Sequence, residues 1–514
     1  MNIVFRTDAS IKIGTGHVIR CLALAQKLKN YGADCGFICR DHDGNLIKKI
    51  QSKGFKTATL SNKLSPTNTE KDLSHSNWLQ TNWRHDAEQT IQALIKSPEW
   101  IIVDHYALDA KWERLIRPHC KKIMVIDDLA DREHDCDLIL DQNINKEIER
   151  RYIGLLPPSC LSLFGPNYAL LHSEYAKLHQ IIEIKSKKIN RILVFFGGYD
   201  NHNLTHLVIE AFLNLKMFNL KLDVVFNKNS IYASNIKGLA QKHENITLHN
   251  NVPSLANLIQ NADFAIGAGG TSVLERFCLG LPSLVITSAK NQVSIAAELH
   301  QQKFIRYLGH YDSVNKSMIT ESLNNLLDCE SLYDWSTHCW NLVDGNGAER
   351  VSSFILIDSN TQLKTRLVSG DDEELLLRWS NDALVRKNAF NQKRISKKEH
   401  HSWFLNRLNN PSFCLIFVIE TFKGIPIGNV RFEFKNDFWE ISFLLDPLVR
   451  GKNLSIKMVE TSIKSFRELN SEADLIGRVK KNNLASKKIF EALGFEIDKS
   501  LHEKNFYQYS LKII

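Results

Sequence analysis

Short runs of β-branched residues alternate with amphipathic stretches of helical length from residue 1 to about residue 355. This alternation is typical of parallel sheets covered by helices. We expect two Rossmann-type α/β domains, residues 1–150 and 151–360, with a ligand cleft at the carboxyl ends of their strands. The predicted strands are Asn2 to Phe5, Cys35 to Cys39, Trp100 to Val103 and Lys122 to Ile126, then, after a connecting stretch around Tyr152 to Pro166, Arg191 to Phe196, Leu222 to Phe226, Phe264 to Ile266 and Ser283 to Ile286.

The pattern changes at about residue 363, after a polar segment from Asp358 to Lys364. The third domain, residues 361–514, is predicted to be α+β with mostly antiparallel strands. Its predicted elements are a strand from Thr365 to Val368, a helix from Asp371 to Trp379, a hairpin of Leu415 to Glu420 and Ile427 to Phe434, a strand from Trp439 to Leu445, and a long helix from Ile456 to Phe466.

Composition narrows the class of protein. The 514 residues predict about three folding units, and 43% hydrophobic with 24% charged residues indicates a soluble globular protein. The net charge of +8 comes without a basic block, so nucleic acid is not required as a partner. No stretch is long and apolar enough for a signal peptide or a membrane span, so we expect a cytoplasmic protein. The 10 cysteines lack zinc spacing, which favours buried free thiols and no metal, and the oligomeric state stays open.

A glycine-rich loop follows the first strand and opens a helix: Ile13-Gly14-Thr15-Gly16-His17. Gly14 and Gly16 allow a tight turn and close approach to a ligand, and the helix start offers N–H groups to an anion. His17 stands at this helix start, where an imidazole can act as a general base near neutral pH. The alternative is a histidine that caps or packs against the helix.

A second glycine loop occupies the mirror position in the second domain, from Gly267 to Glu275. The N–H groups of Gly269, Gly270 and Thr271 can hold a diphosphate, and Glu275 can accept hydrogen bonds from two ribose hydroxyls. The alternative is a packing turn followed by a surface charge. Gly197-Gly198 and Asn291-Gln292 follow two further strands, and the amides of Asn291 and Gln292 suit sugar hydroxyls.

Taken together, these segments resemble the UDP-sugar hydrolases of pseudaminic acid biosynthesis, which are related to the GT-B glycosyltransferase that adds N-acetylglucosamine in peptidoglycan synthesis. The resemblance covers about the first 350 residues and implies a GT-B-like pair of Rossmann-type domains. It is carried by Arg6 to Asp8, Gly14 to Arg20, Val103 to Asp109, Val125 to Arg132, Leu140 to Asn143, Phe195 to Gly198, Gly267 to Glu275 and Asn291-Gln292.

The resemblance implies release of UDP from UDP-2,4-diacetamido-2,4,6-trideoxy-β-L-altropyranose, by attack of water at the anomeric carbon with inversion and without a metal. His17 matches the essential histidine of the family, and Asp104 is expected at the substrate. Asp127, Asp128 and Asp141 also follow strands, where they would meet the sugar or cap a helix. Departures at Tyr199, His202 and His172 bear on substrate preference. A GT-B glycosyltransferase and a non-catalytic UDP-sugar-binding scaffold remain alternatives.

The third domain carries a basic loop before its long helix, and Asn483 lies further on. These features resemble the GNAT acetyltransferases, which implies that acetyl-CoA binds here. The predicted cofactor-binding residues are Arg450, Gly451, Lys452, Asn453, Leu454, Ser455 and Asn483.

Two departures concern this domain. Asn453 and Ser455 replace the two glycines of the usual motif, although asparagine tolerates a left-handed backbone. Phe490 stands where many GNAT enzymes have an acidic tyrosine, so the acid would be Tyr507, Tyr509 or water; Glu440 is a candidate base or an ordinary strand carboxylate. In the pathway that the chain resembles, acetylation of a 4-amino sugar precedes UDP removal, which predicts a bifunctional enzyme; acetylation of a protein amine is the alternative.

Overall fold

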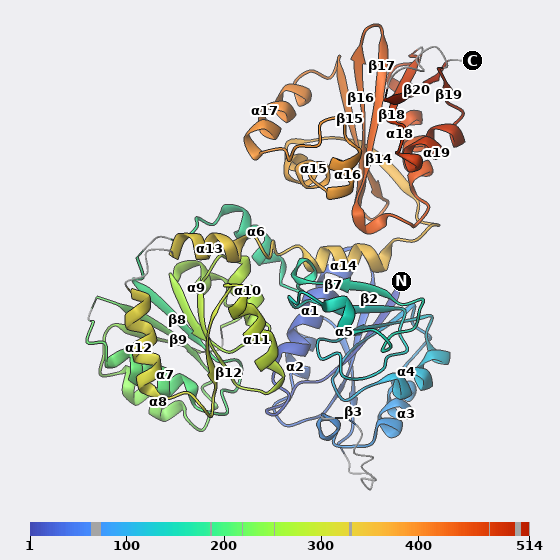
Figure 1. Ribbon diagram of the computed structural model, residues 1–514. Coiled ribbons are helices and arrows are strands. Elements are labelled where there is room, and N and C mark those ends of the chain that lie inside the picture. The colour runs from blue at the N-terminus through green and yellow to red at the C-terminus, as the bar shows by residue number, and fades with distance from the viewer. Residues whose placement is uncertain are drawn as a thin grey trace. The chain divides into compact units, whose positions relative to one another are not determined.

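Two units make up the chain, Met1–Ser352 and Ser353–Ile514. Figure 1 shows the computed structural model, with the first unit coloured from blue to yellow and the second from orange to red. It describes residues 1–62, 73, 75–185, 188–217, 219–250, 252–327, 332–471, 473–498 and 505–512.

The first sheet of the N-terminal unit is parallel, with the order β3-β2-β1-β4-β5-β6-β7. Its central strands are buried on both faces, which explains their continuous apolar runs. The strands are β1 Asn2–Thr7, β2 Asp34–Arg40, β3 Lys56–Leu60, β4 Trp100–Asp104, β5 Lys122–Ile126, β6 Leu138–Asp141 and β7 Leu161–Phe164, and the helices are α1 Gly16–Asn30, α2 Ile47–Ser52, α3 Trp83–Ala93, α4 Ala110–Ile116 and α5 Ile148–Arg151.

The second sheet repeats this arrangement in the order β10-β9-β8-β11-β12-β13. Alternate residues of a strand enter the cores on opposite faces: Ile192 and Val194 pack into one core, and Leu193 into the other. The strands are β8 Arg191–Phe195, β9 Lys221–Phe226, β10 Ile246–Asn250, β11 Phe264–Gly267, β12 Ser283–Thr287 and β13 Arg306–His310, and the helices are α6 Ser173–Ile181, α7 Leu204–Leu213, α8 Ala233–Ala240, α9 Ala256–Asn261, α10 Ser272–Cys278, α11 Asn291–Gln301, α12 Lys316–Leu327, α13 Leu332–Trp340 and α14 Gly347–Leu356.

The C-terminal unit has one mixed sheet in the order β14-β15-β16-β17-β18-β20-β19. Its pairs are antiparallel except β17 with β18, which are parallel. The strands are β14 Leu363–Leu367, β15 Cys414–Thr421, β16 Pro426–Lys435, β17 Phe438–Leu445, β18 Leu475–Lys480, β19 Glu496–Ile497 and β20 Phe506–Leu511, and the helices are α15 Glu373–Ser380, α16 Ala383–Asn388, α17 Lys397–Leu408, α18 Ser455–Leu469 and α19 Leu484–Ala492.

The strand orders confirm the predicted fold class, a pair of Rossmann-type domains followed by an α+β domain. One expectation was wrong: the stretch around Tyr152 to Pro166 is not only a connection, because Leu161–Phe164 forms β7 beside β6. This strand escapes sequence analysis because it is short and lies at an edge, where Leu161 and Ser162 are exposed and leave no continuous apolar run.

Two further expectations concern the whole chain. In the described ranges, no helix has the length and apolar character needed to span a membrane. The described cysteines are free thiols, most of them buried, namely Cys21, Cys35, Cys39, Cys120, Cys136, Cys160, Cys278, Cys339 and Cys414; Cys329 lies outside the described residues.

Candidate active site

A cavity of about 300 Å³ lies where the carboxyl ends of strands from both N-terminal sheets meet. Segments that follow β1, β4, β5 and β6 line one side of it, and segments that follow β8, β11 and β12 line the other. The described lining does not include Asp104 or Glu275, but it includes these residues predicted from the sequence: Gly14, Gly16, His17, Gly269, Gly270, Thr271, Asn291 and Gln292.

The glycine loops of the two sheets face each other across this cavity. A Cβ atom added to Gly16 would lie 3.2 Å from Oγ1 of Thr271, and one added to Gly198 would lie 3.0 Å from Cγ2 of Thr15. Tyr199, a departure from the family pattern, donates its hydroxyl hydrogen to the carbonyl oxygen of Gly44 at 2.8 Å. The glycines therefore allow the two loops to approach each other closely.

Helix N-termini give the cavity a positive electrostatic character. Helices α1, α10 and α11 begin at its wall. Among the described residues, no side chain caps the N-terminus of any of the three helices. In α10 the N–H groups of Val273 and Leu274 donate to main-chain carbonyl oxygens, and in α11 those of Gln292 and Val293 do the same. The first N–H groups of α1 and the glycine-loop N–H groups before α10 are therefore the ones that can meet an anionic ligand.

His17 is held by a buried carboxylate. Its Nδ1 lies 2.6 Å from Oδ1 of Asp104, and Arg20 donates from Nε and Nη2 to the two oxygens of the same carboxylate at 2.6 Å each. Asp104 is wholly buried, and the charge of Arg20 holds its pKa well below the usual value against the effect of burial. An ionised carboxylate only accepts hydrogen bonds, so Nδ1 of His17 carries a proton, and in the neutral imidazole the lone pair lies on Nε2.

A tyrosine stands beside this histidine at the cavity wall. The rings of His17 and Tyr106 meet edge to face with centroids 4.6 Å apart, and Trp78 packs on both. The Tyr106 hydroxyl hydrogen-bonds to Oδ1 of Asp128, which also lines the cavity. Sequence analysis assigned no role to Trp78, which lies in a short 3₁₀ helix outside every motif.

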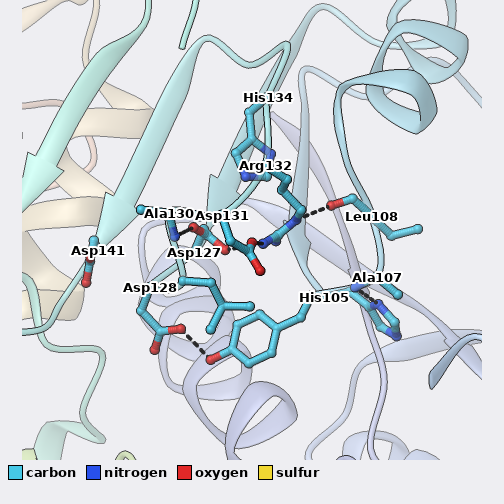
Figure 2. Close-up of polar contacts among 12 residues, drawn as sticks. His105, Ala107, Leu108, Asp127, Asp128, Ala130, Asp131, Arg132, His134 and Asp141 are labelled. Carbon is cyan, nitrogen blue, oxygen red and sulfur yellow. Dashed lines mark hydrogen bonds and ion pairs between the residues drawn. The ribbon is translucent and has the colours of Figure 1, made fainter. Parts of the chain in front are cut away.

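The three aspartates with open roles have different surroundings. Figure 2 shows Asp127 turned toward Ala130 and Arg132, where it accepts from the Ala130 N–H at 2.9 Å and pairs with Arg132 at 2.8 Å. Asp127 thus holds the turn after β5, whereas Asp128 points to the cavity. Burial and the charge of Asp128 raise the pKa of Asp141 to about 7.

Glu275 lies one turn into α10, below the glycine loop. Burial raises its pKa to about 7, although the nearby Tyr175 hydroxyl and the charge of Arg276 act in the opposite direction. Ionisation of the Glu275 carboxyl group is therefore unfavourable unless a further hydrogen-bond donor contacts it. A pair of hydroxyl groups would supply such donors.

The predicted acetyl-CoA loop lies between β17 and α18. Gly451 and Asn453 have left-handed backbones with φ of +78° and +58°, so asparagine takes the conformation for which glycine is usual. Helix α18 starts at Ser455 with 15 residues, and in the described part of the chain no side chain caps its N-terminus. The loop thus fits an anion such as a pyrophosphate.

The charged side chains of this loop have protein partners. Arg450 donates to Asp382 at 2.6 Å, and Nζ of Lys452 donates to the carbonyl oxygens of Phe354 at 2.7 Å and Ile357 at 2.6 Å. Main-chain N–H groups, and not these two cations, are therefore the groups best placed to meet a pyrophosphate. Asn483 caps α19, where its Oδ1 accepts from the Ser486 N–H at 3.3 Å.

Phe490 fills the space between two strands that diverge. Pairing of β17 with β18 ends at Ile441 and Gly477. The Phe490 ring covers Gly477, where an added Cβ would lie 2.3 Å from the ring, and it stacks on Tyr509 at 5.5 Å. The Tyr509 hydroxyl donates to Glu491 at 3.4 Å, and burial raises its pKa to about 12. Among the described residues, no group of three or more His, Cys, Asp or Glu side chains could hold a metal ion.

Known proteins resemble this chain in both its N-terminal and its C-terminal unit. Residues 362–496 match the family described as an acetyltransferase (GNAT) domain. An uncharacterized protein of Methanocaldococcus jannaschii is 25% identical over 522 residues, which covers 98% of this chain and 99% of that protein. The UDP-2,4-diacetamido-2,4,6-trideoxy-beta-L-altropyranose hydrolase of Campylobacter jejuni is 27% identical over 307 residues, covering 59% of this chain and 98% of that protein.

A third relative extends the range of organisms. The spore coat polysaccharide biosynthesis protein SpsG of Bacillus subtilis is 27% identical over 196 residues, covering 37% of this chain and 57% of that protein. The resemblance to this hydrolase family and the GNAT domain expected from the motifs are thereby confirmed. The similarities support an enzyme, and the GNAT domain supports the use of acetyl-CoA.

Proposed function

We propose that the N-terminal unit hydrolyses UDP-2,4-diacetamido-2,4,6-trideoxy-β-L-altropyranose to the free sugar and UDP, without a metal. The observation that carries the proposal is the arrangement around one cavity: His17, backed by Asp104, faces the glycine loops of the second sheet. The similarity to the Campylobacter jejuni hydrolase supplies the substrate.

In the proposed reaction, Nε2 of His17 takes a proton from water while the water oxygen attacks the anomeric carbon. The bond from that carbon to the diphosphate oxygen breaks, and its electron pair leaves on UDP, which inverts the anomeric centre. The N–H groups of Gly269, Gly270 and Thr271 stabilise the departing charge. Asp104, expected at the substrate, has both oxygens occupied below the cavity wall and serves instead to orient His17.

Other predicted residues hold the substrate in this proposal. Glu275 accepts from the ribose hydroxyls, which requires it to approach the cavity when UDP is bound. Asn291 and Gln292 lie at the wall and donate to sugar or phosphate oxygens. Gly14 and Gly16 leave room for the sugar beside His17.

We propose that the C-terminal unit acetylates the 4-amino group of the UDP-sugar before hydrolysis, with acetyl-CoA as donor. The left-handed residues Gly451 and Asn453 and the start of α18 support a pyrophosphate site. Bound acetyl-CoA supplies the activated thioester. The chain's part is to orient it with the N–H groups of the loop and to accept the amine proton, with Glu440 as a candidate base through water.

One experiment tests both activities. The chain is incubated with the amino UDP-sugar, with and without acetyl-CoA, and UDP and acetylated sugar are followed by mass spectrometry and NMR. We expect acetyl-CoA-dependent formation of the diacetamido UDP-sugar, followed by UDP and free sugar. The His17→Asn variant should accumulate the acetylated UDP-sugar, and UDP release at the normal rate would remove His17 from the mechanism.

The alternatives give other results. A glycosyltransferase, which the same cavity and Glu275 would serve, attaches the sugar to an acceptor instead of releasing it. A UDP-sugar-binding scaffold binds without turnover, and the His17→Ala variant would then leave its phenotype unchanged. Acetylation of a protein amine would leave the amino UDP-sugar unmodified.

A further inference from the structure

Tyr106 lines the cavity beside His17, and its hydrogen bond to Asp128 determines whether its hydroxyl group donates to or accepts from a ligand. Asp128 also accepts from the Asn143 amide at 3.1 Å, and Arg20 lies 3.6 Å from it. A carboxylate with these neighbours only accepts hydrogen bonds, so the hydrogen of the Tyr106 hydroxyl is directed to Asp128. The lone pairs on the phenol oxygen are then the groups left for a ligand in the cavity.

Arg20 connects this arrangement to the histidine. Its Nε and Nη2 hold Asp104, which turns Nε2 of His17 into an acceptor, and its Nη1 faces Asp128. The two acceptors belong to rings whose centroids are 4.6 Å apart and that line the same cavity. Both owe their acceptor character to carboxylates that the same guanidinium holds.

We infer that Asp128 is a positioning residue that acts through Tyr106 to orient the attacking water, an inference that rests on the proposed hydrolysis. The water donates one hydrogen to Nε2 of His17 and the other to the Tyr106 oxygen. One of the two lone pairs on its oxygen then points at the anomeric carbon. The first proton moves to His17 as the bond to carbon forms, and the second stays on the product hydroxyl.

Alternative roles for Asp128 are less consistent with its contacts. As a second general base it would have to turn a lone pair to the water while the hydroxyl of Tyr106, the amide of Asn143 and the charge of Arg20 hold its two oxygens and lower their basicity. As a purely structural residue it would not need a place on the cavity wall. Burial and the charge of Asp128 raise the pKa of Tyr106 well above its usual value, which keeps the phenol protonated and able to donate.

A double-mutant cycle tests the inference with UDP release as the readout. We expect Asp128→Asn and Tyr106→Phe each to lower kcat by about 10- to 100-fold with KM changed less than about threefold, because an acceptor in the transition state is lost. The double variant should fall no lower than Tyr106→Phe alone. Asp131→Asn, on the same turn but outside the described cavity lining, is the matched control and should keep its kcat.

The outcomes are distinguishable. If the wild type releases UDP but the losses of the two single variants multiply in the double variant, Asp128 does not act through Tyr106 and the inference fails alone. If the wild type releases no UDP, the proposed function fails and the inference with it. Thermal melting with and without UDP shows that each variant is folded, and Asp128→Ser, which also removes the carboxylate, replaces Asp128→Asn if the latter does not fold.

Discussion

The substitution Asp104→Asn tests the proposed role of His17 most directly. The wild-type carboxylate accepts from Arg20 and from Nδ1 of His17 at 2.6 Å each. The amide nitrogen of asparagine must face one of these donors. In place of Oδ1 it donates to Nδ1 of His17 and moves the ring proton to Nε2, so the ring loses its base; in place of Oδ2 it faces Nε of Arg20 and leaves the tautomer unchanged. Both orientations meet a donor of Arg20, and both remove the negative charge that stabilises the protonated ring in the transition state. General-base catalysis contributes about 10²- to 10⁴-fold, so kcat should fall by a factor in this range, equal to about 3–5 kcal/mol of barrier.

The same substitution changes stability in a pH-dependent way. The folded pKa of Asp104 lies below its unfolded value, so the ionised pair stabilises the protein above about pH 4 and loses this effect as pH falls toward the folded pKa. Removal of one partner of a buried pair costs about 3–5 kcal/mol, and the shape of asparagine should reduce this loss. The difference in unfolding free energy between wild type and Asp104→Asn should therefore shrink below pH 4.

The assay is UDP release under saturating substrate, corrected for the folded fraction by thermal melting. Asp86→Asn is the matched control, because Asp86 is an equally buried carboxylate that accepts from Arg6, Arg40 and Trp112 and is not in the described cavity lining. It should lose stability but keep its kcat. A folded Asp104→Asn variant with kcat within about threefold of wild type would refute the argument on the His17 tautomer.

Three further predictions concern other parts of the chain. Glu275→Gln should raise the unfolding free energy above pH 7 by about 1–2 kcal/mol, because the raised pKa makes ionisation destabilising as pH rises from 4.5 through 7, and should weaken UDP binding in calorimetry. Asn453→Gly should stabilise the C-terminal unit by about 0.5–1 kcal/mol in denaturant melts and keep acetyl-CoA affinity, because glycine adopts the left-handed backbone of this position without strain. Asn453→Val should lower both the stability of the unit and its affinity for acetyl-CoA. Gly267→Ala should cost about 3 kcal/mol in thermal melts, because its Cβ would lie 2.4 Å from the Phe195 carbonyl oxygen; an unchanged melting temperature would contradict the steric argument.

Sequence analysis predicted the elements whose patterns depend on burial alone. The strand Lys122–Ile126 was predicted with the bounds that the structure has, because its apolar run is buried on both faces. The edge strands β3, β7, β10 and β13 were missed, since exposed and half-exposed residues interrupt their apolar pattern. In the C-terminal unit the predicted hairpin of Leu415 to Glu420 and Ile427 to Phe434 is confirmed as β15 and β16, and Gly424 in its turn has a φ of +79°.

The candidate site likewise has features that the sequence predicted and features that it could not predict. The loops around His17 and Gly269 were found because glycines after strands are visible in one sequence, and the structure brings these loops to one cavity. The sequence could not tell that Asp104 lies below His17 and not at the cavity wall, because only the register of β4 beside β1 sets its position. Lys452 matched an anion-binding motif, yet its ammonium meets the carbonyl oxygens of Phe354 and Ile357, about 95 positions earlier in the chain.

Hydrogen-bond polarity explains why the roles at such a site escape sequence motifs. A histidine or a tyrosine can donate or accept, and its neighbour decides which. Here Asp104 accepts a hydrogen bond from His17, and Asp128 accepts one from Tyr106. Arg20 contacts both carboxylates. Arg20 therefore matters to hydrolysis through these two carboxylates, since loss of its charge would free both acceptors to reorient at once.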